Sequence, residues 1–159
     1  MCRPTYFDVP FTTEMNYWMN PNFPPNRVRA LNQWKELYAA YRSLGVHVSL
    51  LRPRSGLFDQ VFTCNVAWGA QGIYVMANPR PRWRIDEIPI AAQWLAKNRF
   101  GVLYLPEYFR FEGQGDVVSI GDSGWLFCFG ARNDPEVYVF LEKMLNLGDN
   151  KKPFVPLQI

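Results

Sequence analysis

The sequence predicts an α/β protein assembled from a recurring strand–strand–helix–strand unit. Two observations support this prediction. Three amphipathic helical segments, each with capping signals, are each followed by a short apolar run that suits a strand. The glycines expected to close these helices, Gly45, Gly101 and Gly148, recur at intervals of about fifty residues, which is the size of a supersecondary repeat.

Each helix is placed by a capping signal before it and a glycine after it. Asn26 and Asp86 are expected to cap the first two helices, and Pro135 suits the first turn of the third. The helices are therefore expected at about residues 26–44, 87–99 and 135–147. The apolar stripe of the first comprises Val28, Leu31, Trp34, Leu37 or Tyr38, Tyr41 and Leu44.

Short apolar runs supply the strands, and two pairs of runs enclose glycine-containing turns at residues 69–72 and 121–124. The expected strands are residues 2–9, 46–51, 61–68, 73–77, 102–105, 117–120, 125–129 and 154–159. We expect these elements to form one domain of three units, at about residues 1–51, 57–106 and 111–159, of which the first lacks one strand.

Composition narrows the possible classes of protein. Of 159 residues, 48% are hydrophobic and 19% charged, which is enough apolar material for a core and excludes a disordered chain. The net charge of +3 comes without a long basic run, so direct nucleic-acid binding is not expected. The densest basic stretch, Arg80, Arg82 and Arg84, is interpreted as solvated or, if functional, as suited to an acidic partner surface. No membrane span and no secretory signal are expected.

Cysteine and histidine usage bears on compartment and metal binding. Cys2, Cys64 and Cys128 lack paired spacing, which favours an intracellular reducing compartment, cytoplasmic or mitochondrial, over secretion. The single histidine, His47, alternates with valines and is interpreted as structural or exposed. Neither a metal nor a cofactor is expected. Cys64 is expected to be a small core residue.

Several motifs, in order along the chain, resemble the pentein superfamily of guanidine-modifying enzymes, and most of all its arginine dihydrolase and amidinotransferase-like subgroup. The motifs are Met1–Val9, Met15–Met19, Ala30–Trp34, Gly56–Asn65, Phe111–Asp116 and Gly130–Asp134. The resemblance implies a fold of five ββαβ units around a pseudo-fivefold axis. Three such units in this chain imply an incomplete pentein fold, a partial α/β-propeller.

The resemblance also implies residue roles, because the family attacks the guanidinium carbon with a cysteine thiolate while a histidine moves protons. Carried over, Asn16, Asp59 and Asn65 would contact a guanidinium group, and Glu112 would pair with the catalytic histidine. Asp116 would position the backbone and Arg132 would contact the substrate carboxylate. The alternatives are a turn role for Glu112 and Asp59, a loop or cap role for Asn16, and a structural amide at Asn65.

This chain departs from the family pattern in ways that bear on activity. The family's catalytic histidine and nucleophilic cysteine fall after the third unit, and none of the three cysteines matches the nucleophile position. Asn78 and Pro81 stand where the subgroup has arginine and histidine, and Tyr17 stands where proline is usual. The chain is therefore expected to be inactive alone.

Two hypotheses about function follow. The first is a non-catalytic pseudoenzyme, acting as a structural or accessory subunit of a larger protein complex. The alternative is one chain of a split arginine dihydrolase or amidinotransferase whose histidine and cysteine come from a second chain. In either case another chain is expected to cover open edges near residues 1–11 and 154–159. An arginine-like ligand is expected only if the pocket retains its ability to bind substrate.

Overall fold

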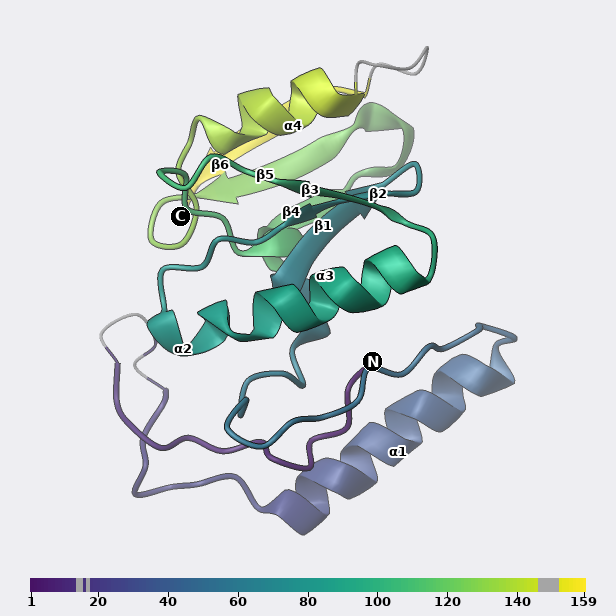
Figure 1. Cartoon of the computed structure of the whole chain (residues 1–159), viewed down its shortest axis with the longest axis vertical. Coiled ribbons are helices and arrows are strands. Elements are labelled where there is room, and N and C mark those ends of the chain that lie inside the picture. The colour runs from purple at the N-terminus through teal and green to yellow at the C-terminus, as the bar shows by residue number, and fades with distance from the viewer. Residues whose placement is uncertain (14–15, 17, 146–151) are drawn as a thin grey trace. The chain divides into compact units, whose positions relative to one another are not determined.

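The computed structural model describes residues 1–13, 16, 18–145 and 152–159. The chain forms two compact units, Met1–Thr63 and Cys64–Ile159 (Figure 1). Each unit is described by itself below. The grouping of all 159 residues into one domain of three repeats stays a prediction.

The first unit is built around one helix, α1 (Arg27–Ser43). The Asn26 side chain accepts the backbone N–H of Arg29 at 3.0 Å, and Gly45 takes a φ of +77°, which confirms both predicted ends of this helix. Trp34 is the buried residue of the predicted stripe and stacks on Tyr38. Four others of the stripe, Val28, Leu37, Tyr41 and Leu44, are exposed.

The strands predicted at residues 2–9 and 46–51 are wrong. Within residues 1–13, 16 and 18–63 the structure has no regular strand, and a single parallel bridge joins Cys2 to Leu51. The physical reason lies just after Cys2. Pro4 has no N–H to give to a ladder, and its carbonyl accepts the N–H of Phe7, so the chain turns away from an extended path.

The second unit contains two strand–strand–helix–strand repeats, which confirms the predicted fold class. The first repeat comprises the 3-10 helix η1 (Thr63–Val66), β1 (Ala67–Ala70), β2 (Ile73–Met76), the short helix α2 (Arg82–Ile85), α3 (Glu87–Lys97) and β3 (Gly101–Tyr104). β1 pairs antiparallel with β2, and β2 pairs parallel with β3. Gln71 and Gly72, both at positive φ, form the two-residue turn between β1 and β2.

The second repeat follows the same plan. It comprises η2 (Gly113–Asp116), β4 (Val117–Ser119), η3 (Gly121–Ser123), β5 (Trp125–Phe129), α4 (Val137–Leu145) and β6 (Phe154–Gln158). β4 and β5 are antiparallel, and β5 and β6 are parallel. η1 begins at Thr63 and η2 at Gly113, so the two repeats are offset by 50 residues.

Three predicted boundaries in the second unit are wrong. The strand expected from residue 61 begins at Ala67, because residues 63–66 wind into η1. Asp86 has helical backbone angles between α2 and α3 and makes no side-chain capping bond. Arg99, at a φ of +65°, reverses the chain after α3, whereas Gly101 opens β3. The helix end expected at 147–148 lies outside the described residues.

Two apolar cores hold the second unit together, and its strands lie between α4 and α3 (Figure 1). The aromatic core comprises Trp68, Val75, Leu105, Phe111, Val117, Phe127, Val137, Leu141 and Phe154. The aliphatic core comprises Val66, Ala67, Met76, Ala77, Ile88, Ala91, Ala92 and Leu95. The aromatic core takes side chains from strands of both sheets, so it fixes one repeat against the other. None of the helices in the described ranges has the length and apolarity of a membrane span.

Candidate functional site

The Phe111–Asp116 motif places its acidic residues through a glycine-dependent contact with the first repeat. Gly113 has a φ of +70°, and a Cβ there would lie 2.8–2.9 Å from the Cys64 carbonyl oxygen and the backbone of Ala67. Only glycine satisfies both the backbone angle and the space. η2 therefore rests directly on the backbone where η1 passes into β1, and Glu112 is held at that junction.

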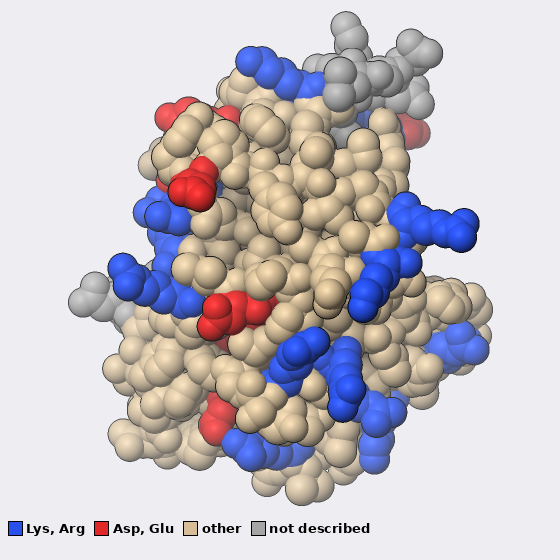
Figure 2. Space-filling view, in the orientation of Figure 1, with Lys and Arg blue, Asp and Glu red and all other residues tan. Residues whose placement is uncertain are grey.

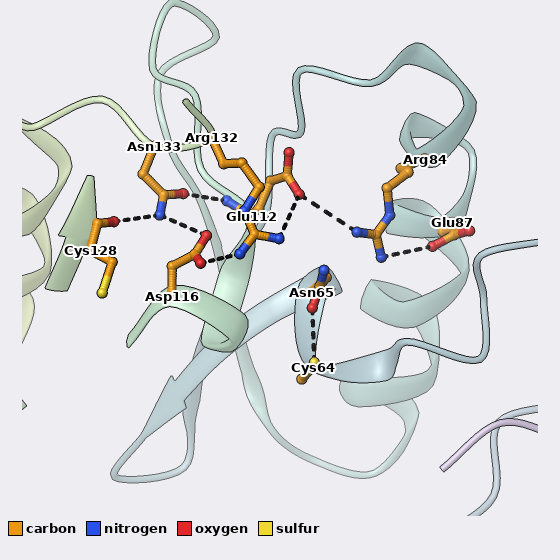
Figure 3. Close-up of polar contacts among 9 residues, drawn as sticks. All are labelled: Cys64, Asn65, Arg84, Glu87, Glu112, Asp116, Cys128, Arg132 and Asn133. Atoms are coloured by element: carbon orange, nitrogen blue, oxygen red, sulfur yellow. Dashed lines mark hydrogen bonds and ion pairs between the residues drawn. The ribbon is translucent and has the colours of Figure 1, made fainter. Parts of the chain in front are cut away.

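Glu112 is 2% exposed and lies between two arginines of the same unit (Figure 3). Its Oε2 atom is 3.6 Å from Nη1 of Arg84 and 3.8 Å from Nη1 of Arg132. A carboxylate with so little access to water needs cationic partners to remain ionised. The two guanidinium groups, from α2 and from the loop after β5, supply them.

Arg132 also binds Asp116, the last residue of η2. Its Nη2 donates to Oδ1 of Asp116, so one guanidinium joins two carboxylates. Asp116 is 4% exposed, whereas the Arg132 side chain is 38% exposed. Arg132 is therefore the member of this group that solvent reaches.

Asn133 connects the same carboxylates through its amide. Its Oδ1 accepts the backbone N–H of Glu112 at 2.8 Å. Its Nδ2 donates to Oδ2 of Asp116 at 3.0 Å and to the carbonyl of Cys128 at 2.8 Å. This buried amide thus fixes both the backbone at Glu112 and the carboxylate of Asp116.

Arg84 has a second acidic neighbour, Glu87 on α3, at 3.7 Å. Both side chains are buried. We call Arg84, Glu87, Glu112, Asp116 and Arg132 the buried ion cluster. It holds three carboxylates and two guanidinium groups, so in the ionised state it carries one net negative charge.

Asn65, on η1, lies beside the second glycine of the motif. A Cβ on Gly115 would be 2.8 Å from Oδ1 of Asn65, so the amide packs on that backbone. The Cys64 thiol donates to the same Oδ1 at 2.8 Å. Cys64 is exposed, so its expected place in the core is wrong, because the 3-10 helix η1 replaces the strand that would have turned it inward.

Asn16 and Asp59 belong to the first unit. Asn16 is exposed, and its Oδ1 accepts the N–H of Trp18 at 3.1 Å, which is a loop contact. Asp59 is 9% exposed, and its carbonyl accepts the N–H of Phe62 at 2.9 Å. The structure therefore brings Asn65, Glu112, Asp116 and Arg132 together within the second unit, while a ligand role for Asn16 and Asp59 stays a prediction.

Asn78 and Pro81, the positions that depart from the family pattern, have structural contacts. The Asn78 amide donates to the carbonyls of Glu107 and Phe109 at 2.9 and 2.7 Å, and its Oδ1 accepts from Arg110. Asn78 thereby fixes the segment that leads to Glu112. Pro81 precedes α2, and its ring suits an extended residue before a helix.

Sequence reasoning missed three members of this site, Arg84, Glu87 and Asn133. Arg84 was expected to be solvated, but it is buried between two carboxylates. Glu87 could have been found from its spacing, because it lies three residues after Arg84 on a helical segment. Asn133 lies within the Gly130–Asp134 motif, but nothing in that motif shows that its amide is buried against Asp116. Across the described residues, no cluster of His, Cys, Asp and Glu has the arrangement of a metal site. His47, in the first unit, is exposed.

Comparison with known proteins gives a consistent result. No family model matches the chain. It is 30% identical over 148 residues to the bifunctional arginine dihydrolase/ornithine cyclodeaminase ArgZ of Synechocystis, covering 92% of this chain and 21% of ArgZ. It is 33% identical over 161 residues to the N(G),N(G)-dimethylarginine dimethylaminohydrolase of Mycobacterium tuberculosis, covering all of this chain and 49% of that protein.

The solved structures agree. The N-terminal domain of the cyanobacterial arginine dihydrolase ArgZ, bound to product, superposes with a TM-score of 0.88 at 25% identity, covering all of this chain and 56% of that one. A dimethylarginine dimethylaminohydrolase from Pseudomonas aeruginosa, complexed with citrulline, shares the fold, with a TM-score of 0.74 at 19% identity and 85% of this chain covered.

The fold and the motif-bearing site thus define an α/β protein built from strand–strand–helix–strand repeats. The chain belongs to the pentein superfamily and matches the N-terminal domain of its ArgZ-like members. It spans about a fifth of ArgZ and about half of the dimethylarginine dimethylaminohydrolase.

Proposed function

We propose that residues 1–159 are a non-catalytic, amidinotransferase-like part of a larger protein assembly, with a structural or accessory role. The observation that carries this proposal is the position of Glu112. In the family this residue is expected to pair with a catalytic histidine. Here its carboxylate lies between the guanidinium groups of Arg84 and Arg132, which belong to the same chain.

The chemistry of guanidine modification supports the same conclusion. Covalent attack on a guanidinium carbon needs a thiolate and a group that moves protons. The Cys64 thiol, which is the exposed one, donates a hydrogen bond to Oδ1 of Asn65. The activities of the relatives belong to proteins of which this chain spans a fifth to a half.

An arginine turnover assay tests the proposal. The purified chain, without any partner, is expected to release no ammonia, citrulline or ornithine from L-arginine above a protein-free blank. A variant with Cys2, Cys64 and Cys128 all replaced by serine is the matched control. Release by the parent chain that disappears in the control variant would overturn the proposal.

A second candidate function is one chain of a split arginine dihydrolase or amidinotransferase. The observation that favours it is the exposed position of Arg132 beside the buried carboxylates of Glu112 and Asp116. This candidate requires turnover of L-arginine once the second chain is present, whereas the first requires that the assembly shows none.

The proposed assembly needs a second polypeptide at the β6 edge. β6 is an outer strand of its sheet, and Val155, Leu157 and Ile159 are exposed. Unpaired apolar strands associate unless they are covered. We expect light scattering at tens of micromolar to give a mass above that of a monomer, and a stable monomer would contradict this part of the proposal. The spacing of Cys2, Cys64 and Cys128, which shows no paired motif, supports a reducing compartment.

A further inference from the structure

A hollow on the second unit, outside the buried ion cluster, is lined by three arginines. Its volume is about 600 Å³, it is open to solvent, and its lining residues are Pro79, Arg80, Arg82, Ile85, Asp86 and Arg110. These residues come from the start of α2 and from the segment before η2. Figure 2 shows Lys and Arg side chains gathered at the side of the molecule on which α2 lies in Figure 1.

Two of the arginines are held in place by neighbours. Nη2 of Arg80 donates to Oδ1 of Asp134 at 2.7 Å, and Oδ2 of Asp134 accepts the backbone N–H of Arg110 at 2.7 Å. Nη1 of Arg110 donates to Oδ1 of Asn78 at 3.1 Å. One carboxylate thus fixes both segments that line the hollow, which gives the arginines a defined arrangement before any ligand arrives.

The arginines keep hydrogen-bonding capacity. A guanidinium has five N–H donors, and these contacts use one each from Arg80 and Arg110. Arg82 is exposed and makes no ion pair within the described residues. Three guanidinium groups against the carboxylates of Asp86 and Asp134 leave one net positive charge at the hollow.

We propose that this hollow binds a carboxylate carried on a short aliphatic stem. A planar guanidinium pairs with a carboxylate through two parallel hydrogen bonds. One net positive charge matches a monoanion better than a phosphate dianion, because Asp86 repels two negative charges more strongly than one. Pro79 and Ile85 supply the apolar part of the lining that suits a methylene stem. This site is separate from the cluster around Glu112 and goes beyond the proposed function.

The test is a titration of the chain with sodium propionate, followed by NMR of the arginine Nε–H signals at low salt. We expect saturable binding with a Kd in the millimolar range. The affinity should fall about fivefold or more in R82Q, because the guanidinium N–H donors of Arg82 are lost. D86N should strengthen binding about twofold or more, because it removes a like charge. R29Q, which removes an exposed arginine of α1, is the matched control and should leave the affinity unchanged.

Two further probes define the ligand. Inorganic phosphate should bind more weakly than propionate. A capped Gly-Glu-Gly peptide that binds more tightly than propionate would assign the carboxylate to a polypeptide side chain, and the reverse order would assign it to a free acid. The proposal is overturned if propionate does not saturate, if R29Q weakens binding as much as R82Q, if D86N weakens it, or if phosphate binds more tightly. Circular dichroism of each variant checks that the fold is kept.

Discussion

The two repeats of the second unit share one topology, yet their 3-10 helices differ in chemistry. In the first repeat η1 ends at Val66, which is buried in the aliphatic core. Fifty residues later η2 ends at Asp116, which is equally buried but bound to Arg132 and Asn133. The same backbone position thus carries a methyl-rich side chain in one repeat and a carboxylate in the other.

The difference teaches how the fold accommodates polar residues. An apolar residue at the end of a 3-10 helix needs only space, whereas a buried carboxylate needs a complete set of partners. The second repeat supplies that set from the loop after β5, through Arg132 and Asn133. The first repeat instead presents Asn65 and the exposed Cys64 beside Gly115. The four predictions below test this contrast.

Breaking the buried ion cluster should have the largest effect. The substitution Arg84→Met leaves Glu87 and Glu112 buried without one of their cations, so we expect a loss of about 3–5 kcal/mol in the free energy of unfolding. Urea denaturation measures this loss. Arg82→Met, at an exposed position on the same short helix, is the control and should cost less than about 0.5 kcal/mol. Equal losses in the two variants would contradict the account.

The close contact between the repeats gives the next effect. Gly113→Ala places a Cβ within 2.9 Å of the backbone of Cys64 and Ala67 at a positive φ, so we expect a loss of about 2–4 kcal/mol. Gly121→Ala has a similar φ and open space around its Cβ, and it should cost only about 1 kcal/mol. Thermal unfolding of both variants measures the difference. Equal costs would show that η2 does not rest on the first repeat.

Two asparagines allow a direct comparison of the repeats. Asn133→Ala removes the partner of the Glu112 N–H, of Asp116 and of the Cys128 carbonyl, so we expect a loss of about 1–3 kcal/mol. Asn65→Ala removes a bond to a thiol at a half-buried position and should cost less than about 1 kcal/mol. Chemical denaturation compares the two variants. A larger loss of stability in Asn65→Ala would contradict the account, in which Asn133 is the asparagine that holds the buried site together.

The smallest effect concerns the packing of Asn65 on Gly115. Gly115→Ala places a Cβ 2.8 Å from Oδ1 of Asn65, which moves aside at a cost of about 1 kcal/mol or less. In an Asn65→Ala background the same substitution should cost nothing, because the opposing atom is gone. A double-mutant cycle measures the coupling between the two positions. Zero coupling would show that the Asn65 side chain does not pack on residue 115 in solution.

Sequence reasoning could predict the repeat, the superfamily and most of the acidic site. Local signals were sufficient for several elements. The Asn26 cap predicts the start of α1, and the spacing of glycines predicts the strands around β5 and the Phe111–Asp116 motif. The strands expected in the first unit could not be corrected from sequence, because the turn after Pro4 depends on a backbone hydrogen bond. Asn133 was missed because its importance lies in Glu112 and Asp116, two partners about twenty residues earlier in the sequence.

The central claim is that the carboxylate of Glu112 is engaged by this chain's own arginines, and the binding of L-arginine tests it most directly. Isothermal titration of the chain with L-arginine, with citrulline as the uncharged control, compares the parent chain with E112Q. We predict no saturable heat for arginine beyond that for citrulline in either protein. The claim would be contradicted if arginine bound saturably while citrulline did not, and if E112Q abolished that binding. Such a result would establish a functional guanidinium-binding site.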